Sequence, residues 1–349
     1  MDEDKFHQFL HQFVTDLGAT MAAGGIVVGD ELGLYKALAA QPRTADELAV
    51  ATGTAVRYVE EWLRGQAAGG YVSYDPESDT YSMTEEQAFA LTDPDGPVYL
   101  PGAFQLALGA LRALPRVVEA FRTGDGIGWH EHDEDVFVGC ERFFRPGYSA
   151  NLVAEWLPAL EGVPEKLEAG ARVADIGCGL GASTILMAQA FPASSFAGSD
   201  YHDHSVELAR KHAADLGLTH RVTFEVAGAS TFHGGPYDLV TSFDSLHDMG
   251  DPVAAATHVR EHLADDGTWM IVEPYAGDTV ADNLNPLGRV FYGLSSFLCV
   301  PNAVSQGGTR TLGAQAGERA IRAVTEEAGF SRFRRATETP FNLVYEARP

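Results

Sequence analysis

A glycine-rich turn and an acidic strand end are the residues that most directly indicate chemistry in this sequence. The segment from Asp175 to Gly181 reads Asp-Ile-Gly-Cys-Gly-Leu-Gly and follows an apolar run typical of a strand. Glycines there let the backbone approach a ligand and lead into a helix whose first amides face it. The next apolar run ends in Asp200, where a carboxylate can accept both hydroxyls of a ribose. Together these features predict a nucleoside site.

Two cofactors fit such a turn. Gly177, Gly179 and Ala182 satisfy the dinucleotide pattern G-x-G-x-x-A, so an NAD-dependent oxidoreductase is one alternative. Asp175 stands two residues before the first glycine, where an acid is well placed to recognise a cationic amino acid and would repel a diphosphate. This position favours a sulfonium-bearing amino acid nucleoside over NAD.

The glycine turn, together with the segment Tyr-Asp-Leu-Val-Thr-Ser-Phe-Asp-Ser-Leu-His-Asp at 237–248, resembles class I S-adenosylmethionine-dependent methyltransferases. With the N-terminal module described below, the resemblance covers almost the whole chain. It extends to small-molecule methyltransferases with a winged-helix dimerisation domain, including plant-type O-methyltransferases and an actinobacterial and mycobacterial methyltransferase-like group. The resemblance implies S-adenosylmethionine as cofactor and S-adenosylhomocysteine as product.

The resemblance also implies which residues contact the cofactor. Tyr201 would flank the adenine and Tyr148 would close over the cofactor. Adenine recognition would fall to Ala229 and Ser230, because this sequence lacks the acid that the family often has there. The expected cofactor-binding residues are Tyr148, Asp175, Gly177, Gly179, Gly181, Asp200, Tyr201, Ala229, Ser230, Phe243 and Asp244.

One histidine is placed to act as a base. Methyl transfer to a hydroxyl requires proton removal, and histidine has a pKa near neutrality, about 6.5. His247 lies in Leu-His-Asp-Met-Gly-Asp at 246–251, which resembles the Leu-His-Asp-x-x-Asp stretch whose histidine is the base in plant-type O-methyltransferases. Either Asp248 or Glu273 is expected to orient it, and His247 with Glu273 is the predicted catalytic pair. The alternative is a histidine that only packs or caps a helix start.

A second cluster of ionisable residues lies at 130–133. His130 and His132 would meet a metal ion only if the segment is extended, and no further ligand spacing supports a metal, so we expect none. The favoured interpretation is a polar loop that lines the acceptor pocket, and Cys178 and Cys299 are interpreted as small apolar fillers. The expected pocket residues are Trp129, His130, His132, Phe144, Asn285 and Tyr292.

The elements that must position these residues follow a regular pattern. From residue 171 onward, apolar runs and helical segments alternate, which is typical of an α/β fold with a Rossmann-like, doubly wound and mainly parallel sheet. Two final runs, at 331–339 and 341–348, are expected to be strands that could pair antiparallel, giving seven strands in all. An insertion at 279–310 is interpreted as a substrate lid.

The N-terminal region predicts a winged helix. Thr44 and Glu47 form a capping box before a helix that Gly53 ends, a longer helix follows, and residues 71–83 alternate like a hairpin. Between residues 44 and 96 there are two basic residues and eleven acids, the opposite of what DNA reading requires. Dimerisation is therefore favoured over DNA binding. The expected ranges are 1–125 for this domain, 126–165 for a helical pocket-lining linker and 166–349 for the catalytic domain.

Composition limits the remaining possibilities. The 349 residues carry a formal charge of −25, which repels nucleic acid and anionic lipid. The acidic N-terminus is unlike a signal peptide, and three scattered cysteines fit a reducing compartment, so we expect a cytoplasmic protein. The prediction is a homodimeric small-molecule methyltransferase, most simply acting at oxygen, although nitrogen, sulfur and carbon acceptors stay open. A winged-helix regulator with a nucleoside-sensing domain is the alternative outside enzymes.

Overall fold

The computed structural model describes residues 1–308 and 310–349. Packing divides the chain into two compact units, Met1–Leu108 with Val138–Pro146, and Gly109–Phe137 with Gly147–Pro349. Helices α6 (Pro101–Arg112) and α8 (Glu134–Asn151) each contribute residues to both units. This division follows packing alone, so the ranges 1–125, 126–165 and 166–349 stay predictions of domain boundaries.

The first unit contains the predicted winged helix. Its helices are α2 (Leu34–Ala40), α3 (Ala45–Thr52), α4 (Val56–Ala68) and α5 (Glu85–Leu91), and its hairpin is β1 (Ser73–Asp75) with β2 (Thr80–Ser82). The capping box is present: Glu47 N donates to Thr44 Oγ1 at 3.3 Å, and Thr44 N donates to Glu47 Oε2 at 2.9 Å. Leu38, Leu48 and Leu63 are at most 1% exposed and join the three helices into one core. The helix–helix–helix–hairpin order is confirmed.

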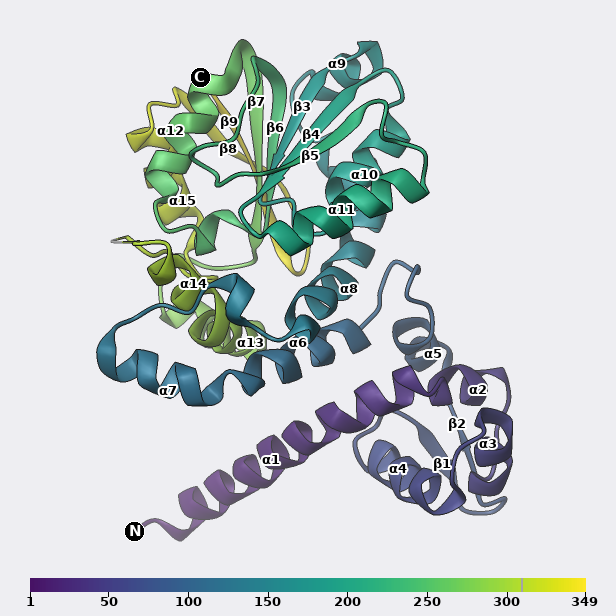
Figure 1. Ribbon diagram of the computed structural model, residues 1–349. Coiled ribbons are helices and arrows are strands. Elements are labelled where there is room, and N and C mark those ends of the chain that lie inside the picture. Colours follow the sequence, from purple (N-terminus) through teal and green to yellow (C-terminus); the bar gives the residue numbers. More distant parts are fainter. Residues whose placement is uncertain (309) are drawn as a thin grey trace. The chain divides into compact units, whose positions relative to one another are not determined.

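Helix α1 (Glu3–Glu31) packs on this core only through its C-terminal part. Ile26 is fully buried, and Trp62 Nε1 donates to Gly25 O at 2.7 Å. The rest of the helix extends beyond α2–α4 (Figure 1). An apolar stripe follows its exposed length, made of Phe6, Phe9, Leu10, Phe13, Val14, Leu17 and Met21, all 40–72% exposed. In the described residues no single helix is long and apolar enough to cross a membrane; only the bent pair α1 and α2, taken together, meets that test of length and composition.

The second unit is built on a seven-stranded sheet in the order β5-β4-β3-β6-β7-β9-β8. Strands β3 to β7 run parallel, and β9 pairs antiparallel with both β7 and β8. The strands are β3 (Arg172–Ile176), β4 (Ser195–Asp200), β5 (Val222–Val226), β6 (Tyr237–Phe243), β7 (Leu263–Pro274), β8 (Arg332–Glu338) and β9 (Asn342–Arg348). The predicted α/β class, the mainly parallel sheet and the antiparallel final pair are confirmed.

Helices cover both halves of the sheet. Helices α10 and α11 pack on the β4–β5 side, whereas α12 and α15 pack near β7 and β8 (Figure 1). The bounds are α7 (Leu114–Thr123), α9 (Val163–Ala169), α10 (Ala182–Ala190), α11 (Asp203–Asp215), α12 (Pro252–His262) and α15 (Gly317–Glu327). The order of the strands reverses between β3 and β6, and ligands of open α/β sheets bind beyond the carboxyl ends of strands at such a point.

The insertion after β7 is helical. It comprises α13 (Pro286–Leu294), a π-helical turn at Ser295–Cys299 and α14 (Val300–Ser305). Residue 309 of the predicted lid 279–310 lies outside the described residues. Helix α14 packs against the short 3₁₀ turn Leu246–Asp248 that follows β6, which brings the insertion to the carboxyl edge of the sheet.

Candidate functional site

The glycine turn after β3 adopts the conformation that its sequence predicts. Gly177 has φ of 72°, in the left-handed region that favours glycine, and its N–H donates to Ser199 O at 2.8 Å. A Cβ atom on Gly177 would lie 2.8 Å from the side chain of Ser245, so the turn and the loop after β6 are in direct contact. A Cβ atom on Gly181 would lie 2.8 Å from Phe224, so this glycine lets α10 pack on β5.

Asp175 is enclosed by its own chain. It is 1% exposed, and its carboxylate accepts hydrogen bonds from Ser183 Oγ and Thr184 Oγ1 at 2.6 Å and from Thr241 Oγ1 at 2.9 Å. Burial raises the pKa of Asp175, and the three hydroxyls counteract that rise. The carboxylate therefore fixes the start of α10 to the ends of β3 and β6. This arrangement favours a positioning role over direct recognition of a ligand.

Asp200 lies at the end of β4 and organises the adjacent loops. Its Oδ2 accepts from Gly179 N and its Oδ1 from His202 N, both at 2.9 Å. The side chain is half-buried, and burial raises its pKa. Each oxygen retains a second lone pair that can accept a ribose hydroxyl, so the residue fits the predicted role.

The stretch after β5 offers few polar groups. Ala229 is half-buried and packs against the sheet core, whereas Ser230 is exposed. The backbone of this stretch stays close to Asp200, because Ala227 N donates to Asp200 O at 3.0 Å. Adenine recognition by Ala229 or Ser230 stays a prediction.

His247 and Glu273 form a buried pair. His247 Nδ1 lies 2.7 Å from Glu273 Oε2, and both side chains are 5% exposed. The other carboxylate oxygen of Glu273 accepts from Leu246 N at 3.0 Å, which fixes the acid at the end of β7. Of the two expected partners, the structure brings Glu273 to the imidazole ring. Burial opposes the positive charge on His247, but the Glu273 carboxylate outweighs it and raises the pKa of His247 well above its usual value.

The Cys299 thiol also lies against His247 and contributes to that raised pKa. It comes from the π-helical turn of the insertion and is half-buried. The interpretation of Cys299 as an apolar filler rather than a nucleophile stays a prediction. Cys178 is buried, and burial raises the pKa of its thiol.

Asp244 occupies a strained backbone position at the end of β6. Its φ is 48°, a left-handed conformation that is uncommon for residues other than glycine and is often found at functional sites. Tyr148 Oη donates to Asp244 Oδ2 at 2.8 Å, and Asn342 Nδ2 donates to Oδ1 at 2.9 Å. Burial and the nearby Glu273 carboxylate raise the pKa of Asp244 to about 7. Phe243 packs beside it, with its ring centroid 5.2 Å from that of Tyr148.

Asn302 was not predicted from the sequence, although it links three parts of the site. It is 2% exposed, and its Oδ1 accepts from Tyr201 Oη and from Trp129 N, the latter at 3.2 Å. Its Nδ2 donates to Asp248 O and Oδ2, both at 3.3 Å. The sequence held one indication of a buried, hydrogen-bonded Asn302, namely its position within the apolar segment Cys-Val-Pro-Asn-Ala-Val. Two further residues of the site were not predicted from the sequence: Asn342, which contacts Asp244, and Ser245, which lies against Gly177.

The expected acceptor residues lie in several environments. The backbone N–H of Trp129 donates to Oη of Tyr201 at 3.0 Å, and Tyr201 is one of the residues expected to contact the cofactor. His132 is 7% exposed, and neither ring nitrogen has a hydrogen-bond partner among the described residues, whereas His130 is exposed. Asn285 caps α13 by accepting from Gly288 N at 2.8 Å. Tyr292 is 37% exposed on the same helix, and Phe144 belongs to the first compact unit. Their contact with an acceptor stays a prediction.

Potential metal ligands do not cluster in the described residues. Across residues 1–308 and 310–349, no group of three or more His, Cys, Asp or Glu side chains is arranged to hold a metal ion.

Comparison with known proteins supports the expected winged-helix domain and the expected methyltransferase domain. Residues 167–303 match the model of a methyltransferase domain, and residues 20–93 match that of an Rv2258c-like winged HTH domain. A ubiquinone biosynthesis O-methyltransferase of Bordetella avium is 34% identical over 116 residues, which are 32% of this chain and 45% of that protein. The chain thus spans about half the length of the curated relatives it matches. The predicted resemblance is confirmed for both domains.

Solved structures match over the full length. A candidate O-methyltransferase of Nostoc punctiforme has a TM-score of 0.73 and 19% identity, with 97% of this chain and 98% of that one covered. Human N-acetylserotonin methyltransferase, solved in complex with S-adenosylmethionine, has a TM-score of 0.70 and 16% identity, with 100% and 98% covered. At these identities the likeness is one of fold.

Proposed function

We propose that this chain, which joins an Rv2258c-like winged HTH domain to a methyltransferase domain, is an S-adenosylmethionine-dependent methyltransferase acting on a small molecule. The observation that carries the proposal is the direct contact between the nucleoside-type turn and the loop that holds the base. Ser245 lies against Gly177, and His247 follows two residues later with its ring fixed by Glu273. A cofactor on the turn would therefore lie next to a group able to accept a proton.

The residues of this chain account for the protein's part in the reaction. S-adenosylmethionine supplies an activated methyl group when bound. Asp200 and the glycine turn would hold the nucleoside, and Tyr148, Phe243 and Asp244 would border the amino acid part. Methyl transfer is a displacement that depends on the alignment of acceptor and methyl group and on the exclusion of water. The buried surroundings of His247 favour both.

The proton of a hydroxyl acceptor would pass to Nε2 of His247. Glu273 occupies Nδ1, so Nε2 is the ring nitrogen that would accept the proton once the ring is neutral. Glu273 then stabilises the imidazolium that forms. We therefore propose oxygen as the atom methylated.

We propose a homodimer formed through the apolar stripe of α1. Seven large apolar side chains, 40–72% exposed, recur along one face of this helix at helical spacing. A second copy would cover this stripe with its own. A cytoplasmic location belongs to the same proposal, because no disulfide joins the three cysteines in the part of the chain that the structure describes, as suits a reducing compartment.

The test is incubation with methyl-labelled S-adenosylmethionine and a metabolite extract, followed by mass spectrometry of labelled products. The wild-type protein should label at least one small molecule. His247→Ala should lower labelling by roughly 100-fold or more, as expected for loss of a general base, while calorimetry shows unchanged S-adenosylhomocysteine affinity. Unchanged labelling by His247→Ala would exclude the histidine as base.

Binding measurements on the same purified protein distinguish the oxidoreductase and the regulator from a methyltransferase. Binding of NADH without binding of S-adenosylhomocysteine would establish the oxidoreductase alternative. Sequence-specific DNA binding that depends on the cofactor would establish a regulator. Against DNA reading, α4 carries Glu60 and Glu61, which form ion pairs with Arg57 and Arg64 on the same helix.

A further inference from the structure

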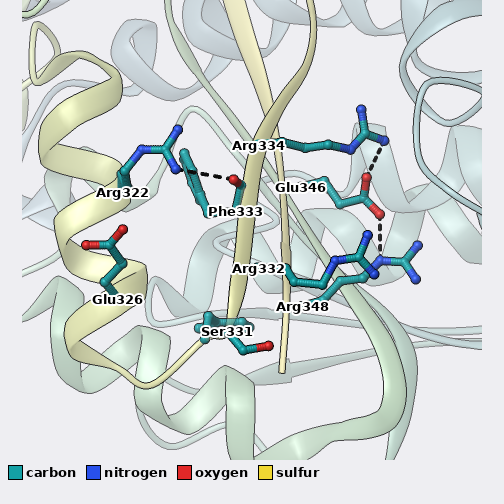
Figure 2. Close-up of a pocket in the computed structure, with 9 residues that line it drawn as sticks. Arg322, Glu326, Ser331, Arg332, Phe333, Arg334, Glu346 and Arg348 are labelled. Carbon is teal, nitrogen blue, oxygen red and sulfur yellow. Dashed lines mark hydrogen bonds and ion pairs between the residues drawn. The ribbon is translucent and has the colours of Figure 1, made fainter.

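A cavity of about 330 Å³ lies at the edge of the sheet formed by β8 and β9, beside α15. Four arginines line it: Arg322 from α15, Arg332 and Arg334 from β8, and Arg348 from β9 (Figure 2). The lining residues include two acids, Glu326 and Glu346, so the cavity carries an excess of positive charge. The whole chain has a formal charge of −25, which makes this concentration of guanidinium groups a local exception.

The sheet register places these charges in an unfavourable arrangement. Arg332 pairs directly with Arg348 across β8 and β9, and Arg334 pairs with Glu346. Like charges directly opposite each other destabilise a sheet, so the first pair requires compensation. Glu161 supplies some of it, because its carboxylate accepts from Arg332 at 2.9 Å and its backbone carbonyl accepts from Arg348.

Glu346 is the other compensating group, and it is shared. Its side chain is 2% exposed and forms ion pairs with both Arg334 and Arg348. Figure 2 shows the guanidinium groups of Arg334 and Arg348 reaching this one carboxylate from the same side of the strands. In addition, Nε of Arg334 is buried without a hydrogen-bond partner among the described residues. A buried donor of this kind is costly unless something accepts its hydrogen bond.

The cavity is also lined by two aromatic residues, and Figure 2 shows Phe333 with Arg322 on the other side of the strands from Arg334 and Glu346. Phe330 and Phe333 line it, and the guanidinium group of Arg322 lies 4.6 Å from the centroid of the Phe333 ring. The volume falls at the lower end of the range for small-molecule sites, about 300 to 1,000 Å³. Guanidinium forks bind phosphate oxygens in pairs, which a lysine ammonium cannot do.

The cavity is far from the proposed methyl-transfer site. Asn342, at the start of β9, pairs with Pro274 at the carboxyl end of β7, next to Glu273 and Asp244. Arg348 is at the opposite end of the same strand, roughly 20 Å away at the usual rise of about 3.3 Å per residue. A ligand in this cavity would leave the cofactor turn accessible.

From this arrangement we propose a second ligand site, which binds a small metabolite carrying a phosphate group. The phosphate would lie between Arg332 and Arg348, relieve their mutual repulsion and accept from Arg334. The site is independent of the proposed function, because none of its residues belongs to the glycine turn or to the His247–Glu273 pair.

The experiment is calorimetry of the full-length protein at constant ionic strength, with inorganic phosphate and AMP as probes and chloride as the reference anion. Binding of either probe is expected, and tighter binding of AMP would indicate an organic phosphate. In Arg332→Lys/Arg348→Lys, which keeps the charge but removes both forks, affinity should fall at least 10-fold. Arg335→Lys is the matched control: it lies on the same strand and is ion-paired with Glu318 and Glu338, but it does not line the cavity.

S-adenosylhomocysteine affinity and the melting temperature serve as controls for folding and should be unchanged in the control variant. Absence of binding by both probes would overturn the proposal. So would an equal loss of affinity in Arg335→Lys, because the effect would then be one of general charge. If S-adenosylhomocysteine fails to bind while phosphate binds, the proposed function fails and this site stands.

Discussion

The imidazole Nδ1 of His247 lies 2.7 Å from Oε2 of Glu273, with both side chains 5% exposed. Because the carboxylate favours the imidazolium in this buried site, the pKa of His247 is raised well above its usual value. A base with a raised pKa becomes able to accept a proton only at a higher pH than an ordinary histidine does. The pair therefore sets the pH at which the reaction can run.

Glu273→Gln should lower the pKa of His247, since burial then acts without the opposing carboxylate. We expect labelling by the wild type to increase with pH above the ordinary histidine range, and the variant to reach its plateau at lower pH. NMR titration of the histidine resonances measures the pKa without an acceptor. A titration of His247 that is the same in both proteins would contradict the electrostatic role of Glu273.

The same pair contributes to stability with a defined sign. The folded-state pKa of His247 is raised, so its contribution is fully present below the unfolded-state pKa of about 6.5 and is lost as pH rises through the folded-state value. Chemical denaturation at pH 6 and at pH 10 should therefore show a smaller pH-dependent loss in Glu273→Gln than in the wild type. An equal loss in both proteins would count against this linkage.

Asn302 is expected to affect cofactor affinity through its hydrogen bond with Tyr201. Asn302→Ala and Tyr201→Phe should each weaken S-adenosylhomocysteine binding by roughly 5-fold, the effect of one hydrogen bond of about 1 kcal/mol. The double variant should lose little more than either single one, because both remove the same contact. Gln306→Ala is the matched control, since Gln306 also donates to Asp248 O, at 3.2 Å, from the same helical segment. Additive losses would show that the two residues act separately.

The apolar stripe of α1 predicts how the oligomer can be disrupted. Phe9→Asp/Phe13→Asp places two charges in the stripe and should convert a dimer to a monomer in light scattering coupled to size exclusion. Gln8→Asp/Gln12→Asp adds the same charges to the opposite face of the helix and should leave the dimer intact. A monomeric wild type at micromolar concentration would refute the proposed interface.

His132 predicts an acid sensitivity of the fold. Burial, assisted by the nearby Arg116, lowers the pKa of His132 to about 4. The unfolded chain binds a proton at that residue below about pH 6.5 and the folded chain does not, so stability falls as pH decreases from 6.5 to 4. The contribution is of the order of 3 kcal/mol. His132→Leu should reduce the loss seen by denaturation at pH 7 and pH 4.5, whereas His220→Gln, an exposed histidine, should not.

Residues at the ends of elements were the most predictable part of the site. Asp200 and His247 follow apolar runs whose length and alternation predict strands, and the parallel topology brings such ends to one edge. The role of Asp175 was less predictable. Its position suggested ligand recognition, but enclosure by Ser183, Thr184 and Thr241 depends on packing that spacing along the chain does not encode.

Contacts between distant segments were the part that sequence reasoning missed. Asn302 and Asn342 lie far along the chain from the residues they contact, Tyr201 and Asp244. No local pattern assigns such partners, because a buried amide reaches its partner only when the insertion after β7 and the last strand are in place. The insertion of β9 between β7 and β8 was likewise not readable from the antiparallel pair alone.

That insertion has a consequence for biosynthesis. While a ribosome is still translating residues 332–338, the glycine turn, His247 and Glu273 have already been made, but one edge of β7 lacks the partner that β9 later provides. Asp244 also lacks Asn342 until the same residues leave the exit tunnel. The β7 edge and the Asp244 carboxylate therefore reach their final contacts only after β9 has been made, and until then β7 keeps one unpaired edge.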